Sequence, residues 1–258
     1  MPTELSPQNP RVQRVRDLGE ARTRRERGSF TLEGPTLLAE ALRSGLVLEE
    51  LYGTAAAFGA HAALVAEVES AGVPAYMLPE RALARLSSVE TPSGLLAVAR
   101  QSPAALAALL AAPGPVLLLA GVSDPGNAGT LLRSAEAFGA AGAVFGRGGV
   151  DPYNPKVVRA AMGSIFRLPI AVAEPGELLA AAAAAGRPVV ATATDGEPLG
   201  ETPLDPRSIV AVGSERHGVA GWLPRWDRTV RIEQRGAAES LNAAVAGSIV
   251  LYELSRKW

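Results

Sequence analysis

The residues best suited to chemistry gather in three short stretches, each rich in glycine and polar side chains. The first is GVSDPGNAGTLLRSAEAFGA, residues 121–140. Its Pro-Gly pair predicts a turn, Asn127 can cap the following helix, and Arg133 falls near that helix's second turn. A purely structural interpretation stays open, with Asn127 only a cap and Arg133 paired with Glu136 at i+3.

The second stretch is VGSERHGV, residues 212–219, in which two glycines, Gly213 and Gly218, bracket a Glu-Arg-His cluster. Glycines allow the backbone to approach a ligand closely. Glu215 can orient an arginine or a substrate hydroxyl, and His217 can act as a base, since its ordinary pKa lies near 6.5. The structural alternative is a turn with solvated charges.

The third stretch, residues 231–254, begins where a strand ends at Ile232. We expect Ser240 to cap a long helix, which leaves Asn242 inside the first turn, where Asn is a poor helix former. A plain capping role for Ser240 is the structural alternative. The apolar stripe predicted for this helix consists of Leu241, Val245, Ile249 and Tyr252.

Each stretch follows an apolar run that indicates a buried strand. Strands are expected at 116–120, 143–145, 169–172, 189–193, 209–212 and 229–232. Helices are expected at 127–138, 155–163, 176–185 and 240–256. This alternation predicts an α/β domain with a mostly parallel sheet covered on both faces. Ligands in such sheets gather beyond the C-terminal ends of the strands, where the three stretches lie.

The first hundred residues predict a separate, smaller α/β domain. Its expected helices are 36–43, 60–70 and 79–86, and its expected strands are 46–52, 75–78 and 94–99. An Ala/Leu helix flanked by Pro and Gly then predicts a linker. The domain boundaries expected from this pattern are 1–100, 101–114 and 115–258.

Composition excludes several kinds of site. The chain has no cysteine and only two histidines, so disulfides, thiolate metal sites and a histidine-rich metal site are not expected. No Walker A, GxGxxG or GxSxG pattern occurs. No apolar run reaches the roughly 18 residues that span a bilayer, and the first residues are too polar for a secretory signal. We expect a soluble, cytoplasmic protein.

Positive charge is concentrated at the start of the chain, although the net charge is only −1. Seven arginines fall within the first 28 residues, and guanidinium groups suit bidentate contacts with phosphate. The cluster fits an RNA-binding arm and a solvated helix face equally well. The candidate RNA contacts are Arg22, Arg24 and Arg25.

Taken in order, the three stretches resemble the three signature motifs of the SpoU (TrmH) family of RNA ribose 2′-O-methyltransferases. The matching segments are DPGNAGTLLRSAEAFG, VGSERHGV and ESLNAAVAGSIVLYE, and VDPYNPKVVRAAMGSIFRLPI resembles the family's connecting segment. FTLEGPTLLAEAL and TPSGLLAVA resemble its N-terminal substrate-binding domain, akin to small kink-turn-binding ribosomal proteins. The resemblance covers nearly the whole chain.

The resemblance implies a SPOUT-type α/β domain with a deep trefoil knot, a small N-terminal α/β RNA-binding domain, and a homodimer whose active site is completed across the interface. The implied methyl donor is S-adenosylmethionine. It would be bound by Gly213, Ile232 and Leu241, with Thr192, Ala193 and Ser240 nearby.

The implied reaction is methylation of a ribose 2′-hydroxyl in structured RNA, with ribosomal RNA favoured over transfer RNA as the substrate and with no metal. The implied catalytic residues are Arg133, Asn127, Glu215 and Asn242. A guanidinium is a poor base because it stays protonated, so we expect Arg133 to bind a phosphate and stabilise the alkoxide. Two alternatives stay open: a non-catalytic RNA-binding or ribosome-assembly factor, and an enzyme that methylates a base nitrogen.

Overall fold

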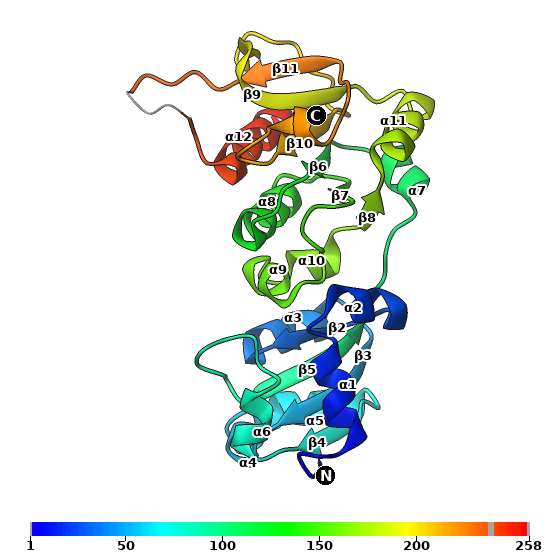
Figure 1. The fold of residues 1–258 in the computed structure, drawn as a ribbon, viewed down its shortest axis with the longest axis vertical. Helices are drawn as coiled ribbons and strands as arrows, with labels where there is room; N and C mark the ends of the chain where they lie inside the picture. The colour runs from blue at the N-terminus through cyan, green and yellow to red at the C-terminus, as the bar shows by residue number, and fades with distance from the viewer. Residues whose placement is uncertain (1, 237–239, 257–258) are drawn as a thin grey trace. The chain divides into compact units, whose positions relative to one another are not determined.

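The computed structural model describes residues 2–236 and 240–256. Contacts within the chain divide it into two compact units (Figure 1). The first comprises Met1–Gln101 together with Tyr153–Phe166, and the second comprises Ser102–Pro152 together with Arg167–Trp258. The chain therefore crosses between the units three times.

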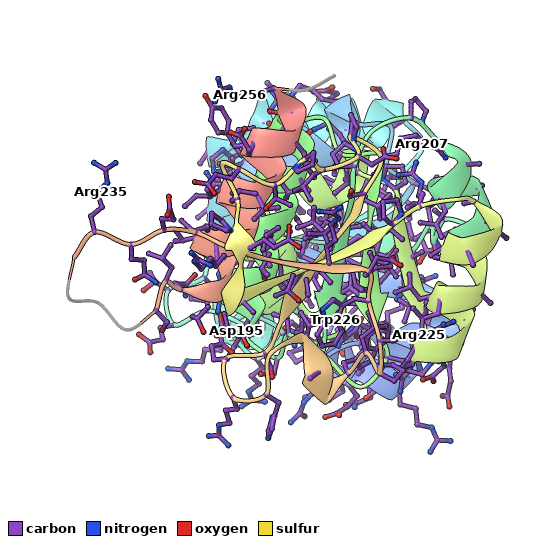
Figure 2. The ribbon with its side chains drawn as sticks, turned by 90° about the horizontal axis from the view of Figure 1, so that it is seen from above. Asp195, Arg207, Arg225, Trp226, Arg235 and Arg256 are labelled. Carbon is purple, nitrogen blue, oxygen red and sulfur yellow. The ribbon has the colours of Figure 1, made fainter. Side chains whose placement is uncertain are left out.

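The second unit is built on the mostly parallel sheet that the apolar runs predict. Its strands are β6 (Val116–Ala120), β7 (Gly142–Gly146), β8 (Ile170–Ala173), β9 (Val189–Pro198), β10 (Ile209–Gly213) and β11 (Arg228–Arg231). They lie in the order β11-β9-β10-β6-β7-β8, and every neighbouring pair is parallel. Beside β11, the Nε1 of Trp226 donates to the Oγ1 of Thr229 at 2.7 Å (Figure 2).

Helices cover both faces of this sheet. They are α7 (Leu106–Ala111), α8 (Pro125–Ala137), α11 (Pro175–Ala184) and α12 (Ala243–Ser255). Figure 1 shows α8 beside α12 on one face and α7 beside α11 on the other. Strand β6 (VLLLA) is buried along its whole length, as a strand covered on both faces must be. No helix in the described part of the chain is long and apolar enough to cross a membrane.

Helix α12 buries a different face from the one that the sequence predicts. Val245 and Tyr252 of the predicted stripe are 45% and 50% exposed. The buried residues are Ala244, Gly247, Val250, Leu251 and Leu254. Gly247 explains the choice, because a Cβ at this position would come within 2.6 Å of both Leu131 and Val212. The missing side chain of Gly247 lets α12 approach Leu131 of α8 and Val212 of β10 closely at this point.

The helix predicted within the linker is α7, and it belongs to the core of the second unit. Leu109 and Leu110 are buried there. Arg187, itself 3% exposed, donates to the carbonyl oxygens of Leu110 (2.5 Å), Gly114 (2.7 Å) and Ala112 at the end of α7. Burial lowers the pKa of Arg187, because it disfavours the charged form.

The first unit holds a five-stranded mixed sheet in the order β1-β4-β3-β5-β2, with β5 antiparallel to both neighbours. Its strands are β1 (Thr3–Glu4), β2 (Ser29–Glu33), β3 (Leu48–Gly53), β4 (Ala75–Met77) and β5 (Leu95–Arg100). Its helices are α1 (Pro10–Asp17), α2 (Ala21–Arg27), α3 (Pro35–Arg43), α4 (Ala55–Ala60), α5 (Ala62–Ser70), α6 (Glu80–Ala84), α9 (Pro155–Ala160) and α10, which begins at Ser164 and ends at Arg167. The arginine-rich start of the chain is thus helical.

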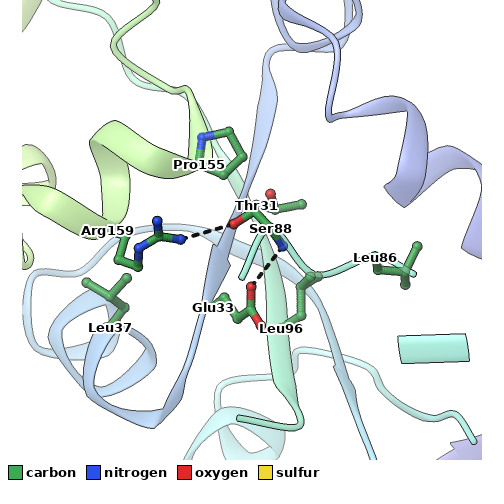
Figure 3. A pocket seen from close by; sticks show the side chains of 8 residues that line it. All are labelled: Thr31, Glu33, Leu37, Leu86, Ser88, Leu96, Pro155 and Arg159. Atoms are coloured by element: carbon green, nitrogen blue, oxygen red, sulfur yellow. Dashed lines mark hydrogen bonds between the residues drawn. The ribbon is translucent and has the colours of Figure 1, made fainter. Parts of the chain in front are cut away.

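Segment 153–166 packs on the first unit, although the sequence pattern groups helix 155–163 with the second half. The aromatic ring of Phe30 decides this. Phe30 is 1% exposed, and its ring centroid lies 4.9 Å from that of Tyr153 and 6.4 Å from that of Phe166. In addition, Arg159 donates to the hydroxyl of Ser88 at 3.4 Å (Figure 3). Sequence periodicity carries no information about which sheet a helix covers.

We predict that Phe30→Ala lowers the free energy of unfolding by about 3–5 kcal/mol, because it removes a buried ring held between two aromatic partners. Urea unfolding followed by circular dichroism measures the change. Val47→Ala, at a position that is 55% exposed, is the control. A loss below about 1 kcal/mol for Phe30→Ala would contradict the proposed packing of segment 153–166.

Candidate functional site

The sheet order brings the predicted polar stretches together. Strands β6 and β10 are neighbours, with Gly213 paired to Ala120, so the loops after both strands leave the sheet side by side. Helix α12 packs against α8 and β10. The third stretch therefore joins the other two at the C-terminal edge of the strands.

Three of the four predicted catalytic residues form one hydrogen-bonded network. The Nδ2 of Asn242 donates to the Oδ1 of Asn127 at 3.0 Å. The Nδ2 of Asn127 in turn donates to the Oε1 of Glu215. A single amide thus joins segments that lie far apart in the sequence.

The caps of both helices differ from the predicted ones. Asn242, and not Ser240, caps α12, because its Oδ1 accepts from the backbone N–H groups of Ala244 (2.9 Å) and Val245 (3.2 Å). The helix begins at Ala243, so Asn242 lies before the first turn and not inside it. Its side chain therefore caps with the oxygen and joins the network with the nitrogen.

Asp124, and not Asn127, caps α8. The Oδ1 of Asp124 accepts from the backbone N–H of Asn127 at 2.7 Å. The amide side chain of Asn127 is consequently available for the network.

Arg133 lies further along α8 and is exposed. Within the described part of the chain its guanidinium has no hydrogen-bond or ion-pair partner. The i+3 pair with Glu136 is not formed, because Glu136 accepts from Arg167. Arg133 is thus the one predicted catalytic residue that the network of this chain does not contain.

A cavity of about 400 Å³ opens beside the network, and Glu215 and Asn242 contribute to both. All six predicted cofactor-binding residues line it: Thr192, Ala193, Gly213, Ile232, Ser240 and Leu241. Its further apolar walls are Val212, Val230, Ala246 and Val250. Sequence reasoning missed Thr194, which adjoins Ala193, and Gln234, which lies two residues after Ile232; neither carried a signal of its own.

The second loop is held against the ends of the neighbouring strands by Trp222. Its Nε1 donates to the carbonyl oxygen of Arg147 at 2.9 Å. A Cβ on Gly146 would come within 2.6 Å of the indole, and one on Gly121 would come within 3.4 Å of the Trp222 Cβ. No sequence motif pointed to this tryptophan. His217, by contrast, is exposed and does not line the cavity, so the geometry gives no support to its role as a base.

Of the three arginines in the first unit that were predicted to contact RNA, one is buried and two are exposed. Arg24 is only 1% exposed and donates to the carbonyl oxygens of Leu18 and Gly19, both at 2.8 Å. It therefore stabilises the turn between α1 and α2 and is not accessible to RNA, which corrects the prediction. Arg22 is exposed and pairs with Glu26 at 2.7 Å, and Arg25 is exposed.

The comparison with protein families matches this architecture. The model of the SpoU rRNA Methylase family matches residues 114–252, more than half of the chain. The chain belongs to the SpoU family. The model of the MRM3-like substrate binding domain matches residues 9–97. Among the described residues of this SpoU protein, no three acidic or histidine side chains are grouped as a metal site.

Relatives of the SpoU protein resemble it over nearly its whole length. The 23S rRNA (guanosine(2553)-2′-O)-methyltransferase of Bacillus subtilis is 35% identical over 94% of this chain and 96% of its own. The 23S rRNA (adenosine(1067)-2′-O)-methyltransferase of Streptomyces laurentii is 31% identical over 96% and 93%. The crystal structure of AdoMet-bound rRNA methyltransferase from Sinorhizobium meliloti superposes with a TM-score of 0.86 at 29% identity, covering 99% of this chain and 98% of that one. The fold is the SPOUT α/β fold, and the trefoil knot stays a prediction.

We predict that Asn242→Ala lowers the free energy of unfolding by about 1 kcal/mol, because α12 loses its cap. Asn242→Asp should change it by far less, since a carboxylate oxygen caps equally well while the donor to Asn127 is lost. Urea unfolding of both variants measures the difference. Equal losses in the two variants would show that capping is not the stabilising role of Asn242.

Proposed function

We propose that this protein transfers a methyl group from S-adenosylmethionine to a ribose 2′-hydroxyl of ribosomal RNA. The observation that carries the proposal is the sharing of Glu215 and Asn242 between the cavity and the polar network. A cofactor in the cavity and a hydroxyl at the network would thus be adjacent. Both relatives described above are named as 2′-O-methyltransferases of 23S rRNA.

The residues of the cavity fit the proposed cofactor. Its volume of about 400 Å³ lies within the range of roughly 300–1,000 Å³ that is usual for small-molecule sites. Leu241, Val230 and Val250 offer apolar surface to the adenine ring, while Thr192 and Gln234 offer polar groups. When bound, S-adenosylmethionine supplies a methyl group that its sulfonium has already activated.

The network orients the attacking hydroxyl. Asn127 holds one carboxylate oxygen of Glu215, and the carboxylate retains further acceptor capacity for a ribose hydroxyl or an incoming guanidinium. Asn242 fixes the amide of Asn127 from the other side. Because these dipoles are already oriented, alignment needs no rearrangement, and alignment alone can supply up to about 7–11 kcal/mol.

Arg133 is the proposed charge-stabilising residue. A guanidinium stays protonated, so its role is to bind a phosphate beside the target ribose and to stabilise the 2′-oxygen as negative charge develops. It is exposed and has no partner among the described residues, so its donors are available to RNA.

The substrate is an RNA, because the reacting group is a 2′-hydroxyl. The proposed roles are RNA binding for the first unit, which contains the expected domain 1–100, and methyl transfer for the second unit, which contains most of 115–258 and helix α7 of the expected linker 101–114. The match to a substrate-binding family model over residues 9–97 supports the first role. Exposed Arg22 and Arg25 would contact phosphates, and the cytoplasm, where ribosomal RNA is found, is the proposed location.

The proposed assembly is a homodimer. Val245 and Tyr252 expose large apolar side chains on α12, and the ring of Phe138 contacts that of Tyr252 edge-on at 5.4 Å between centroids. A two-fold contact through this face would bury them. It would also bring a second set of site residues near the first, including the partner's copy of the unpaired arginine on α8.

The proposed function is tested with labelled S-adenosylmethionine and either total ribosomal RNA or total transfer RNA, followed by nuclease digestion and mass spectrometry of the nucleosides. We expect a 2′-O-methylated nucleoside from the ribosomal RNA. A methyl group on a base nitrogen would overturn the reaction proposed. Cofactor binding without incorporation into either RNA would indicate a non-catalytic RNA-binding factor.

We predict that Arg133→Ala reduces methyl transfer at least a hundredfold while leaving the affinity for S-adenosylmethionine unchanged, because Arg133 acts on the RNA and not on the cofactor. Single-turnover methylation and isothermal titration calorimetry measure the two effects. Loss of cofactor affinity in this variant would contradict the role given to Arg133.

A further inference from the structure

The turn that carries Glu215 is closed by hydrogen bonds between its two ends. The N–H of Gly218 donates to the carbonyl oxygen of Ser214 at 2.9 Å, and the hydroxyl of Ser214 accepts from the N–H of His217 at 3.2 Å. A Cβ on Gly213 would lie 2.0 Å from the Gly218 backbone, so the two ends of the turn are in direct contact. Gly218 has a φ of +56°, which favours glycine.

The closed turn exposes the side chains of Glu215, Arg216 and His217. Glu215 contacts Asn127 and lines the cavity, as described above. The side chain of Arg216, next in the chain, is exposed. Its backbone is fixed by the turn, so a ligand that binds Arg216 has only the side chain to order, which lowers the entropic cost of binding.

Most arginines of the second unit already have partners. Ion pairs join Arg147 to Glu174, Arg167 to Glu136, Arg228 to Glu197 and Arg256 to Glu253. Arg187, Arg207 and Arg231 donate to backbone carbonyls. Within the described residues, the arginines of this unit without a partner are Arg133, Arg216, Arg225 and Arg235. Figure 2 shows Arg235 extending away from the ribbon on the connection before α12.

Two of these four arginines are tied to the network. Arg133 lies on the helix that supplies Asn127, and Arg216 adjoins Glu215. A ribose within an RNA chain has one phosphate on its 5′ side and another on its 3′ side. The proposed role of Arg133 uses one of them and leaves the other without a cation.

We propose that Arg216 binds the second phosphate that flanks the target ribose. This inference rests on the proposed function and adds a substrate-binding residue to it. The planar guanidinium takes up a phosphate through two parallel hydrogen bonds. With Arg133 on helix α8 and Arg216 on the loop after β10, the RNA backbone is held on both sides of the reacting hydroxyl. Arg216 is therefore a determinant of RNA affinity and not of cofactor binding.

The test compares Arg216→Ala with Arg225→Ala, which removes the same charge from an exposed, unpaired arginine further along the chain. Filter binding of a labelled 23S rRNA transcript is measured over a range of salt concentrations. Arg216→Ala should weaken binding about five- to tenfold near 0.1 M salt and reduce the slope of log affinity against log salt by about 0.7–0.9. Arg225→Ala should change neither.

Arg216→Lys is the conservative variant. It should keep the slope, since the charge remains, yet bind more weakly than the wild type because the bidentate fork is lost. Calorimetry should give wild-type affinity for S-adenosylmethionine in all three variants. An unchanged slope in Arg216→Ala, or an equal decrease in Arg225→Ala, overturns the inference.

The binding experiment separates this inference from the proposed function. If the wild-type protein methylates ribosomal RNA but Arg216→Ala leaves the slope of log RNA affinity against log salt unchanged, the inference alone is wrong. If the wild-type protein transfers no methyl group but Arg216→Ala reduces the slope of log RNA affinity against log salt, the proposed reaction is wrong and the phosphate contact of Arg216 still holds.

Discussion

The site depends on the two hydrogen bonds that the side-chain amide of Asn127 makes with Asn242 and Glu215. This amide accepts from Asn242 and donates to Glu215, so one planar group fixes the loops after β6 and β10 and the start of α12 relative to one another. This arrangement requires a division of labour at the helix ends. Asp124 caps α8 and frees the amide, while Asn242 caps α12 with its oxygen and keeps its nitrogen for the network. At Asn242, capping and the network are therefore coupled through two different atoms of one side chain.

The sheet provides the distances within which the network can form. Strands β6 and β10 are neighbours although β7, β8 and β9 intervene in sequence, and their parallel register ends both at one edge. Two glycines then bring helix α12 and the second loop close to the sheet. Gly247 lets α12 lie directly on Leu131 and Val212, and Gly213 lets the second loop fold back on itself. The cavity lies where these small residues bring helix and loop together, between the network and the apolar walls.

The features that the sequence predicted correctly are those that depend on the local pattern of apolar and polar residues. Buried strands such as β6 and β10 are continuous apolar runs, and the polar residues that follow them were identified as Asn127, Glu215 and Asn242. The caps were wrong because several residues near each helix start can cap, and tertiary partners select among them. The predicted buried face of α12 was wrong because the close contact at Gly247 turns the face that carries Gly247, Val250 and Leu254 toward the core. Arg24 was misassigned because nothing in a run of arginines marks the one that turns inward.

Because of segment 153–166, the first unit is built from two separate stretches of the chain. This piece interrupts the second unit in sequence, yet its aromatic residues complete the core around Phe30 in the first. The first unit is therefore not a detachable module at the start of the chain. A recombination event that exchanged only residues 1–101 would leave the inserted helices without the surface they evolved to cover. An exchange of the whole first unit would therefore have to replace two separate stretches of the chain, residues 1–101 and 153–166, together.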